Sequence, residues 1–477
     1  MEAQTQRRLE REGRRTVNRF DVIVIGSGQG GVPFAARAAT AGRKTLLIER
    51  AELGGTCVNR GCTPSKTMVA SARAAHVARN AGRLGVQTGD VQVDLGTVVD
   101  RKNAIVRQWR DGIGRRLERA GDQHCLKRGH AKFIGPREIE VENERFTADI
   151  IVINTGARPA IPPVPGLDDV PYADSTSIME LRETPAHLIV LGGGYIGCEF
   201  GQMFRRFGAG VTIINRGSHI VDREDEDVSA ALEDVFSAEG IDLFLDRQVV
   251  RVEGGGTDIT VHLDEGPAVR GTHLLVAVGR VPNTESLGAD AADIVLDGRG
   301  FITVDDRYQT NVPGVYAIGD VTGGPQFTHT SWDDHRILFD LLGIDPARSA
   351  GQRTRADRLI PYTVFTDPQV ARVGISEREA QAGGIAHEVA AMPFGHIARA
   401  IEMDETAGII KVLIDPQTER ILGAAIVGTE AGELIHVFIA LMQAGATARA
   451  IVDAEMVHPA LAEGLQSVLL RLDRYTL

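Results

Sequence analysis

Two cysteines five positions apart, Cys57 and Cys62, are the chemically most informative residues of this chain. They follow a glycine-rich segment at residues 26–31, which reads Gly-Ser-Gly-Gln-Gly-Gly. A pair of thiols can form a disulfide and exchange it with another one, so the pair can carry two electrons. Glycine-rich turns bind the phosphates of nucleotide cofactors. The two features together predict that electrons pass from a bound cofactor to a disulfide.

The residues after the cysteines favour a reactive thiol. Pro64 suits the first turn of a helix, which would place Cys62 near the positive end of that helix, where the pKa of a thiol is lowered. Lys66, one turn further on, adds positive charge. Half of a zinc site and two packing thiols are the alternatives, but Cys125 and Cys198 have no near partner and do not complete a zinc site. We therefore expect redox activity, no bound metal, and ordinary packing for the other two cysteines.

A disulfide exchange needs a proton donor for the thiolate that leaves. His458 offers one, because Pro459 directly after it is expected to open a helix that runs to Leu472. Glu463 lies just over one turn further along that helix, where its carboxylate can orient the imidazole. A histidine at a helix start is more often a cap or a surface residue, so this assignment depends on the other motifs.

Two segments of the chain repeat the same order of strand, glycine turn, helix and strand. In the first, residues 20–25 are expected to form a strand, residues 30–42 a helix and residues 44–49 a second strand. In the second, residues 187–191 are expected to form a strand, the glycine turn at 192–197 is followed by a helix to about residue 208, and residues 211–214 form the next strand. Each segment is the opening of a doubly wound sheet, and the pair suggests two separate dinucleotides.

The glycines of the first turn have distinct expected roles. Gly26 permits the tight turn, Gly28 lets the backbone approach a pyrophosphate, and Gly31 packs helix against strand. Glu49, which closes the second strand, would accept hydrogen bonds from a ribose hydroxyl. Asp320, at the end of an expected strand over residues 310–320, could bind a chain of sugar-like hydroxyls. Together these positions suggest FAD, and a helix starting at residues 327–332 could stabilise negative charge on the reduced flavin.

The second turn carries Gly192, Gly194 and Gly197 in the equivalent places. The strand that follows ends in Asn215 and Arg216 instead of an acid. An acid favours the free 2′-hydroxyl of NAD, whereas arginine suits a 2′-phosphate. We therefore expect NADPH, with NADH as the alternative donor. The other interpretation of Arg216 is a surface charge without a ligand.

The predicted fold is α/β, with two Rossmann-like doubly wound nucleotide-binding domains and an α+β C-terminal dimerisation domain. The expected divisions are a flexible extension at 1–19, an FAD-binding domain at 20–156 and 285–345, an NAD(P)-binding domain at 157–284 and an interface domain at 346–477. Further residues assigned to the cofactor sites are Gly55, Thr56, Thr155, Gly156, Gly279 and Arg280.

Composition excludes several classes of protein. The net charge of −12, with no sustained basic run beyond the N-terminus, argues against a nucleic-acid surface. No apolar run approaches the roughly 20 residues of a membrane span. Residues 1–19 lack the apolar core of a secretory signal and contain too many acids for a transit peptide. A cytoplasmic protein is therefore expected.

Taken together, the motifs resemble the class I pyridine nucleotide-disulfide oxidoreductases, which include glutathione reductase, dihydrolipoyl dehydrogenase and mercuric reductase. The resemblance implies that FAD and NAD(P)H meet at the flavin ring, with Cys62 as the flavin-facing charge-transfer thiol and Cys57 as the interchange thiol. It further implies a homodimer in which His458 and Glu463 act on the partner subunit's disulfide. By the same resemblance, Lys66 and Glu199 form a pair near the flavin, and Tyr195 gates the nicotinamide pocket.

The residues expected to recognise the substrate and the coenzyme differ from those of all three enzymes. No cysteine pair precedes Leu477 to receive a metal ion, as in mercuric reductases, and the catalytic histidine that those enzymes generally replace is present. Ala36 stands where glutathione reductases carry a substrate-binding arginine, and Asn215 and Arg216 stand where dihydrolipoyl dehydrogenases usually have an acid. The leading hypothesis is reduction of a small disulfide by NAD(P)H. The alternatives are a reductase of Hg(II) or another soft metal ion and a dihydrolipoyl dehydrogenase-type subunit that serves a protein partner.

Overall fold

The computed structural model describes residues 17–345 and 352–476, which divide into two compact units. The first unit comprises the described residues of Met1–Pro64, Asn103–Arg158 and Arg280–Arg358, and the second comprises those of Ser65–Lys102, Pro159–Gly279 and Leu359–Leu477. The predicted extension at 1–19 lies outside the described residues, except for Val17 to Arg19, which begin the first strand. The domain boundaries predicted above stay predictions.

A mainly parallel sheet forms the centre of the first unit. Its parallel strands are, in spatial order, β3 (His124–Arg128), β2 (Thr45–Glu49), β1 (Val17–Ile25), β6 (Glu144–Ile153) and β16 (Val315–Ala317). Two antiparallel strands, β5 (Glu138–Val141) and β4 (Lys132–Gly135), extend from the first half of β6. The chain order reverses at β1, so the place where such sheets bind ligands lies at its carboxyl end.

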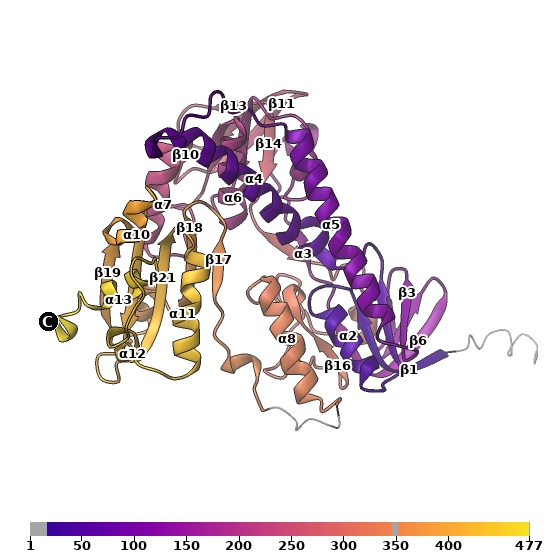
Figure 1. Ribbon diagram of the computed structural model, residues 1–477. Helices are drawn as coiled ribbons and strands as arrows, with labels where there is room; N and C mark the ends of the chain where they lie inside the picture. Colours follow the sequence, from indigo (N-terminus) through magenta and orange to yellow (C-terminus); the bar gives the residue numbers. More distant parts are fainter. Residues whose placement is uncertain (1–16, 346–351, 477) are drawn as a thin grey trace, which may run out of the picture. The chain divides into compact units, whose positions relative to one another are not determined.

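The second half of β1, Val22 to Ile25, is buried on both faces, which explains why these four residues are all apolar. Val22 and Val24 pack into the cluster formed with α2 (Gly31–Thr40) and α8 (Thr328–Leu341), and Ile23 and Ile25 pack into the cluster on the other face. The two helices lie side by side over the sheet (Figure 1). The sheet therefore holds the glycine turn between β1 and α2 from both sides.

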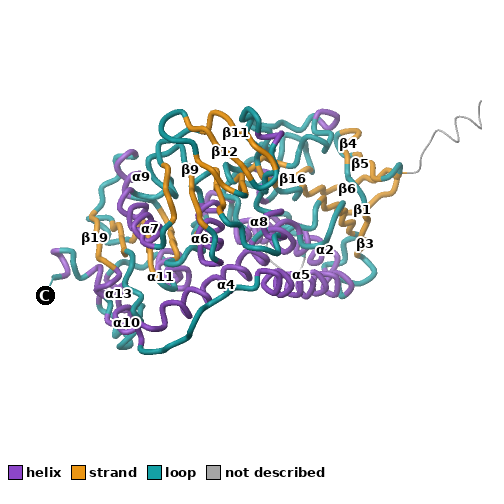
Figure 2. The backbone as a smooth tube through the Cα atoms, turned by 90° about the horizontal axis from the view of Figure 1, so that it is seen from above, coloured by secondary structure: helices purple, strands orange, loops and turns teal. Residues whose placement is uncertain are grey.

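The second unit repeats this plan and adds a second sheet. Four parallel strands, β10 (Ile241–Phe244), β9 (Gly210–Ile214), β8 (His187–Leu191) and β14 (His273–Val276), pack against α6 (Tyr195–Phe207) and α7 (Glu226–Ala238). The antiparallel strands β11 (Val249–Gly255), β12 (Asp258–Leu263) and β13 (Val269–Gly271) share an apolar cluster with the opposite face of β8. In Figure 2, β11 and β12 are labelled next to β9. The prediction of two doubly wound nucleotide-binding folds is confirmed.

The rest of the second unit is the predicted α+β part. A five-stranded antiparallel sheet has the order β17 (Tyr362–Val364), β18 (Gln369–Gly374), β21 (Ile421–Gly428), β20 (Ile409–Ile414) and β19 (Glu388–Pro393). Helix α11 (Ala431–Gln443) packs across β18 and β21 (Figure 1), and α13 (Glu463–Leu469) packs against β19 and β20. These elements bury one apolar cluster of their own.

Three helices follow the first glycine turn in the sequence. Helix α3 (Gly55–Arg60) contains Cys57, and α4 (Cys62–Asn80) begins at the second cysteine. Helix α5 is Leu95–Glu118. Cys62 is therefore the first residue of its helix, as the position of Pro64 predicted.

Two predicted elements are shorter than expected. The predicted strand at 310–320 is reduced to β16, because the Thr310 hydroxyl bonds the amide of Val312 and the carbonyl of Val315 and so forms a local turn. The predicted helix at 459–472 begins only at Glu463, and Pro459 does not open it. There the Glu463 carboxylate accepts the amide N–H of Ala460 (2.8 Å), which makes the preceding residues a capping turn.

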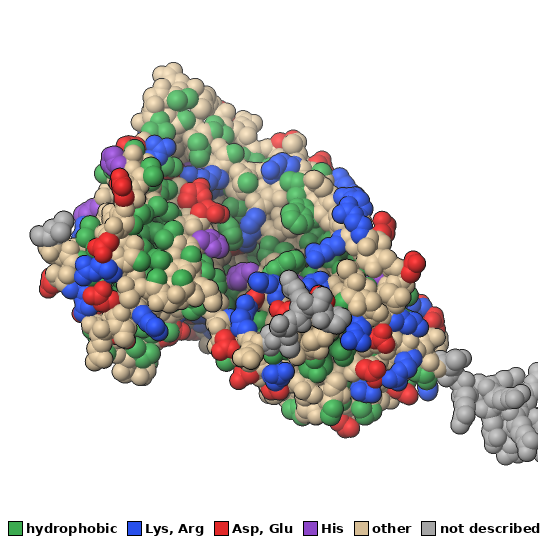
Figure 3. Space-filling view, turned by 60° about the horizontal axis from the view of Figure 1, so that its bottom comes forward, with side chains coloured by type: hydrophobic (Ala, Val, Ile, Leu, Met, Phe, Trp, Pro, Cys, Tyr) green, Lys and Arg blue, Asp and Glu red, His purple; other side chains and the backbone are tan. Residues whose placement is uncertain are grey.

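The surface mixes charges of both signs. On the face drawn in Figure 3, acidic and basic side chains are interspersed with apolar ones, which agrees with the modest net charge of −12. No helix in the described part of the chain combines the length and the apolar character needed to cross a bilayer.

Candidate functional site

The first glycine turn is closed tightly between β1 and α2. Gly26 has φ +101°, a conformation open mainly to glycine. A Cβ atom on Gly31 would lie 2.1 Å from the carbonyl oxygen of Gly26, so this glycine lets α2 pack directly on the turn. A Cβ atom on Gly28 would lie 2.6 Å from Oδ1 of Asn154. Gly26 and Gly31 thus allow the tight turn and the close packing of α2 on it, and Gly28 makes room for a neighbouring side chain.

That neighbour, Asn154, is a residue that the sequence analysis missed. Its Oδ1 accepts the amide N–H of Gly31 (2.9 Å), and its Nδ2 donates to the carbonyl of Ile318 (2.9 Å). Its own backbone amide donates to the carbonyl of Ile25 (2.8 Å). A Cβ atom on Gly319 would lie 2.8 Å from Nδ2 of the same side chain. The buried Asn154 therefore joins the glycine turn to the residues that precede Asp320.

Buried polar atoms without partners gather near Asp320. Asp320 lies in the turn Gly319–Thr322, and Nη2 of Arg280 is 3.3 Å from its carboxylate. Burial raises the pKa of Asp320, although Arg280 opposes the shift. Nε of Arg280 and Oγ1 of Thr155 are buried and make no hydrogen bond within the described part of the chain. Since buried polar groups are normally satisfied, these atoms fit a polar ligand such as the ribityl chain and phosphates of FAD.

Glu49 lies where the prediction requires it, at the carboxyl end of β2. Its Oε2 accepts the amide (2.8 Å) and the hydroxyl (2.6 Å) of Ser27, and its Oε1 accepts the amide of Ala51 (2.8 Å). A carboxylate offers about four acceptor positions. Three protein bonds hold it against the glycine turn and leave capacity for one ribose hydroxyl.

The cysteine segment is docked on this first turn. The amide of Gly54 donates to the carbonyl of Ser27 (3.1 Å), and a Cβ atom on Gly55 would lie 2.8 Å from Cα of Gly28. Gly55 has φ +61°, which also favours glycine. Helix α3, with Thr56 and Cys57, therefore starts in contact with the predicted phosphate-binding turn.

The second cysteine is tied to the other end of the same site. Sγ of Cys62 lies 3.1 Å from Oγ1 of Thr328, the first residue of α8, at hydrogen-bonding distance with either atom as donor. Between the cysteines, Oδ1 of Asn59 accepts two hydrogen bonds from Arg110 on α5 (2.7 and 3.0 Å). The first unit thus brings together the glycine turn, the cysteine segment and the start of α8.

The second glycine turn has an open cradle. Gly192 has φ +107°, and a Cβ atom on Gly197 would lie 1.9 Å from the carbonyl oxygen of Gly192. At Gly194, in contrast, a Cβ atom would meet nothing within 4 Å. This backbone can be approached closely at the N-terminus of α6, which is the arrangement that binds a pyrophosphate. Gly279 directly precedes β15, and a Cβ atom there would also meet nothing within 4 Å.

The loop that carries Arg216 is held by polar contacts. Oδ1 of Asn215 accepts the amide of Gly193 (3.1 Å), and its Nδ2 donates to the carbonyl of His219 (2.7 Å). Glu233 accepts the amide of Ile220 (2.9 Å). Arg216 itself is exposed and forms no ion pair with any described residue. A fixed loop therefore presents a guanidinium that is available to an anionic ligand.

Two predicted pairs in the second unit are formed. Nζ of Lys66 lies 2.6 Å from Oε2 of Glu199, whose Oε1 accepts the amide of Phe365 (2.8 Å). Nδ1 of His458 lies 3.0 Å from Oε1 of Glu463. The bond from the Ala460 amide and the bond to the imidazole lower the pKa of Glu463. The carboxylate thus fixes Nδ1 of the ring, and the imidazole itself is 68% exposed.

The remaining predicted positions are as follows. The turn residue Gly156 precedes the short strand β7 (Ala157–Pro159), whose partner β15 (Arg280–Pro282) begins at Arg280. Cys198 lies in α6 as predicted, where its thiol donates to the carbonyl of Gly193 (3.3 Å) and burial raises its pKa. Cys125 is exposed on β3. Among the described residues, no group of three or more potential ligands could hold a metal ion.

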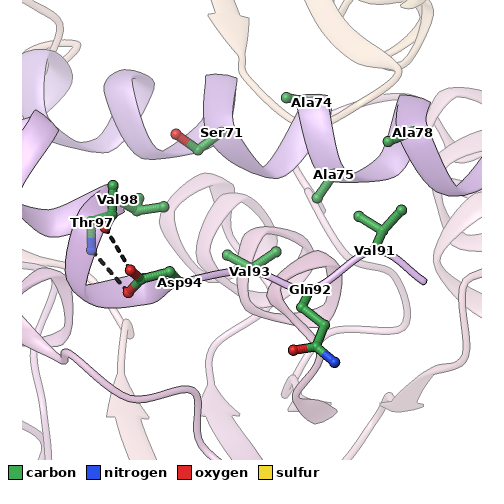
Figure 4. Close-up of a pocket in the computed structure, with 10 residues that line it drawn as sticks. All are labelled: Ser71, Ala74, Ala75, Ala78, Val91, Gln92, Val93, Asp94, Thr97 and Val98. Carbon is green, nitrogen blue, oxygen red and sulfur yellow. Dashed lines mark hydrogen bonds between the residues drawn. The ribbon is translucent and has the colours of Figure 1, made fainter. Parts of the chain in front are cut away.

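A shallow groove of about 370 Å³ lies elsewhere in the second unit, between α4 and the segment at 91–98 (Figure 4). Ala75 and Ala78 line it from the helix, and Val91 and Val93 line it from the segment. The carboxylate of Asp94 turns back to the amide (3.1 Å) and hydroxyl (2.6 Å) of Thr97. None of its lining residues is a cysteine or a histidine, so the groove offers no redox chemistry.

The sequence of the chain matches a known family of proteins. Residues 20–334 match the family model described as pyridine nucleotide-disulphide oxidoreductase, and residues 360–469 match its dimerisation domain. The chain is 35% identical to the probable pyridine nucleotide-disulfide oxidoreductase RclA of Escherichia coli over 95% of this chain and 99% of that protein. It is 36% identical to dihydrolipoyl dehydrogenase of Chlamydia muridarum (95% and 97%) and 33% identical to mercuric reductase of Staphylococcus aureus (95% and 83%).

Among solved structures, the chain is similar to the Cu(II) complex of the HOCl-induced flavoprotein disulfide reductase RclA from Escherichia coli. The TM-score is 0.86 at 34% sequence identity, and the match covers 95% of this chain and 99% of that one.

Proposed function

The chain belongs to the pyridine nucleotide-disulphide oxidoreductases, and from this premise we propose that it is an NADPH-dependent flavoenzyme that reduces a small disulfide. The family is FAD-dependent and uses NAD(P)H as electron donor. The observation that carries the proposal is the docking of Gly54 and Gly55 on the first glycine turn, with Cys62 in contact with Thr328. The redox-active segment and the predicted FAD cradle are thus one continuous piece of structure.

The proposed roles follow from the chemistry of each side chain. When bound, FAD would supply two-electron chemistry between a nicotinamide and a disulfide. Glu49, Asp320 and Thr155 would hold its polar groups, and Cys57 and Cys62 would form that disulfide. Once the disulfide is reduced, the thiolate of Cys57 attacks a sulfur of the substrate and Cys62 resolves the mixed disulfide.

The proton for the leaving thiolate is assigned to His458. Glu463 accepts from Nδ1 of the imidazole, which leaves Nε2 to hold and deliver the proton. The side chain is 68% exposed, and Val457 beside it is 79% exposed. An apolar and a catalytic side chain that both project outward support a homodimer in which each subunit completes the active site of the other.

The choice of NADPH rests on Arg216 and gives a direct prediction. Arg216→Ala is expected to raise the KM for NADPH about 10- to 100-fold, because one charge-assisted hydrogen bond to the 2′-phosphate is lost. The KM for NADH should not change, since NADH lacks that phosphate. Steady-state kinetics with both dinucleotides measure the effect. Equal changes for both would show that Arg216 does not recognise the phosphate.

The position of Asn154 gives a second prediction. Asn154→Asp keeps the acceptor for Gly31 but replaces the donor to Ile318 by a carboxylate beside an anion-binding turn. We expect the affinity of the apoprotein for FAD to fall about 10- to 100-fold. Reconstitution followed by flavin fluorescence measures it. Asn311→Asp is the matched control, because Asn311 also accepts from one amide and donates to one carbonyl, at Val295 and Asp293. A similar loss of FAD in both variants would contradict the assignment.

A second candidate function is the reduction of a soft metal ion by the same cysteines. It is favoured by the similarity to RclA, whose structure is a Cu(II) complex, and to mercuric reductases. Thiolates are suitable ligands for such ions.

One experiment tests both functions: anaerobic titration of the purified protein with NADPH and NADH, then a panel of small disulfides, Cu(II) and Hg(II). We expect NADPH to bleach the flavin and a disulfide to reoxidise it fastest. A protein that reoxidises only with metal ions would overturn the first proposal in favour of the second.

A further inference from the structure

A buried carboxylate, Glu224, lies next to the second glycine turn in the second unit. The amide of Val221 donates to the carbonyl of Gly193 in that turn (2.8 Å), and the amide of Glu224 donates to the carbonyl of Val221 (2.9 Å). The residue is only 2% exposed. Glu224 is therefore fixed to the dinucleotide turn by its backbone, and its side chain has no part in the roles proposed so far.

Two tyrosines share the carboxylate of Glu224. The hydroxyl of Tyr362 donates to its Oε1, and the hydroxyl of Tyr195 lies 3.5 Å from the same oxygen. The two rings are stacked, with centroids 5.4 Å apart and an angle of 29° between their planes. Tyr195 directly follows Gly194, where the cradle is open. The side chain of Tyr195 is thus held by the stacked ring of Tyr362 and, at its hydroxyl, by the carboxylate of Glu224.

An arginine completes this cluster. Arg372 on β18 is the cross-strand partner of Tyr362 on β17. Its Nη1 lies 3.6 Å from Oε2 of Glu224 and donates to the carbonyl of Arg223 (3.2 Å). Tyr362 and Arg372 lie within residues 360–469, the match to the dimerisation domain. The contacts of Tyr195 therefore extend from the dinucleotide fold into the dimerisation domain.

Electrostatics indicate that this carboxylate has a function beyond packing. Burying a carboxylate is unfavourable, and an apolar side chain of similar volume is often no less stable. Burial raises the pKa of Glu224 against the opposing effects of Tyr362 and Arg372. Burial and the nearby Glu224 raise the pKa of Tyr195 to about 12, so its hydroxyl keeps its proton and can donate. Groups shifted in this way by burial and by a specific partner are common at functional sites.

We propose that Glu224 is a positioning residue for Tyr195, which it holds in the orientation that leaves the cradle at Gly194 open to the nicotinamide dinucleotide. This inference rests on the proposed dinucleotide site and adds a residue that acts on the ligand through another side chain. A side chain that is already ordered loses less freedom when the ligand binds. The anchor therefore favours binding, and its strength depends on the charge of Glu224 and on the strand pair that carries Tyr362 and Arg372.

The test is the equilibrium binding of NADP⁺ to the purified holoprotein, measured by isothermal titration calorimetry. Glu224→Gln and Tyr195→Phe should each weaken binding about 3- to 10-fold, the effect of one additional side chain to be ordered. The double variant should be no weaker than either single one, because both changes remove the same interaction. Additive effects, unchanged affinity or tighter binding in the single variants would overturn the proposal.

Glu239→Gln is the matched control. Glu239 is a part-buried carboxylate of the same unit and pairs with Arg206 (2.6 Å). We expect its replacement to lower the thermal unfolding temperature and to leave the affinity for NADP⁺ unchanged. If it weakens binding as much as Glu224→Gln does, the role of Glu224 is only structural. If the unmodified protein binds neither NADP⁺ nor NADPH, the proposed function fails together with this inference.

The pH dependence of NADP⁺ binding distinguishes a positioning role of Glu224 from a purely structural one. Glu224 is faced by Tyr195 from α6, by Tyr362 and Arg372 from β17 and β18, and by Arg223 and Asp225 of its own loop. Because its pKa is raised, Glu224 takes up a proton as the pH falls from neutral, and the unmodified protein should then lose affinity until it equals Glu224→Gln. The phosphate of NADP⁺ titrates alike in every variant. A constant ratio between the two proteins across the acidic and neutral range would contradict the anchor.

Discussion

Replacement of Cys62 by serine is expected to lower NADPH-dependent disulfide turnover at least about 1,000-fold, with the fold and the FAD content retained. A serine oxygen cannot form or exchange a disulfide, so the two-electron carrier is lost completely. The contact at the start of α4 survives, because a serine hydroxyl can also bond Oγ1 of Thr328. The variant therefore removes the chemistry and keeps the local structure.

The measurement is steady-state turnover with whichever small disulfide the unmodified protein reduces fastest. The ratio of FAD to protein is determined in the same samples. Cys125→Ser is the control, since Cys125 is also exposed but lies on β3, away from the cysteine segment. It should retain full activity. A Cys62→Ser protein with more than about a tenth of the normal turnover would end the assignment of this residue.

His458→Ala is expected to lower disulfide turnover about 100- to 10,000-fold, the usual contribution of a positioned general acid or base. The bleaching of the flavin by NADPH in a single turnover should not change, because His458 acts only on the leaving thiolate. Reduction of Cu(II) or Hg(II) should also persist, since no thiolate of a disulfide substrate then needs a proton. The variant therefore separates the two candidate functions.

The control for this variant is another exposed histidine paired with a glutamate. Nε2 of His262 on β12 lies 2.7 Å from Oε1 of Glu253 on β11. His262→Ala removes the same side chain from the same kind of pair and should leave turnover unchanged. Glu463→Gln should have an intermediate effect, because the amide oxygen of the new side chain could still accept from Nδ1 but would not stabilise the charged ring. Equal disulfide turnover in His458→Ala and the unmodified enzyme would rule out the role of His458.

The features that were predictable from the sequence are local ones. The run from Phe20 to Ile25 and the glycines after it specify a strand and a tight turn through neighbouring residues only. The same holds for the second turn at Gly192 and for Pro64, which marked the start of α4. Both nucleotide-binding folds, the α+β C-terminal part and the family were therefore correctly predicted.

The features that were missed depend on contacts between distant parts of the chain. Asn154 bonds Gly31, 123 positions away, and Ile318, 164 positions away, and its own surroundings in the sequence carry no such signal. Glu224 meets Tyr362 at a separation of 138 positions. The start of α13 was missed for a different reason: the carboxylate of Glu463 bonds backwards to Ala460 and replaces the expected first turn.

The contact between Cys62 and Thr328 joins residues 266 positions apart. A ribosome adds about 5 to 20 residues per second, so the cysteine is synthesised roughly 13 to 53 s before its neighbour. During this interval both thiols belong to an unfinished chain and can react with any oxidant or metal ion in their surroundings. Until α8 has been made, Cys62 lacks the contact with Thr328 that it has in the folded unit, so the surroundings of the reactive pair are completed only late in synthesis.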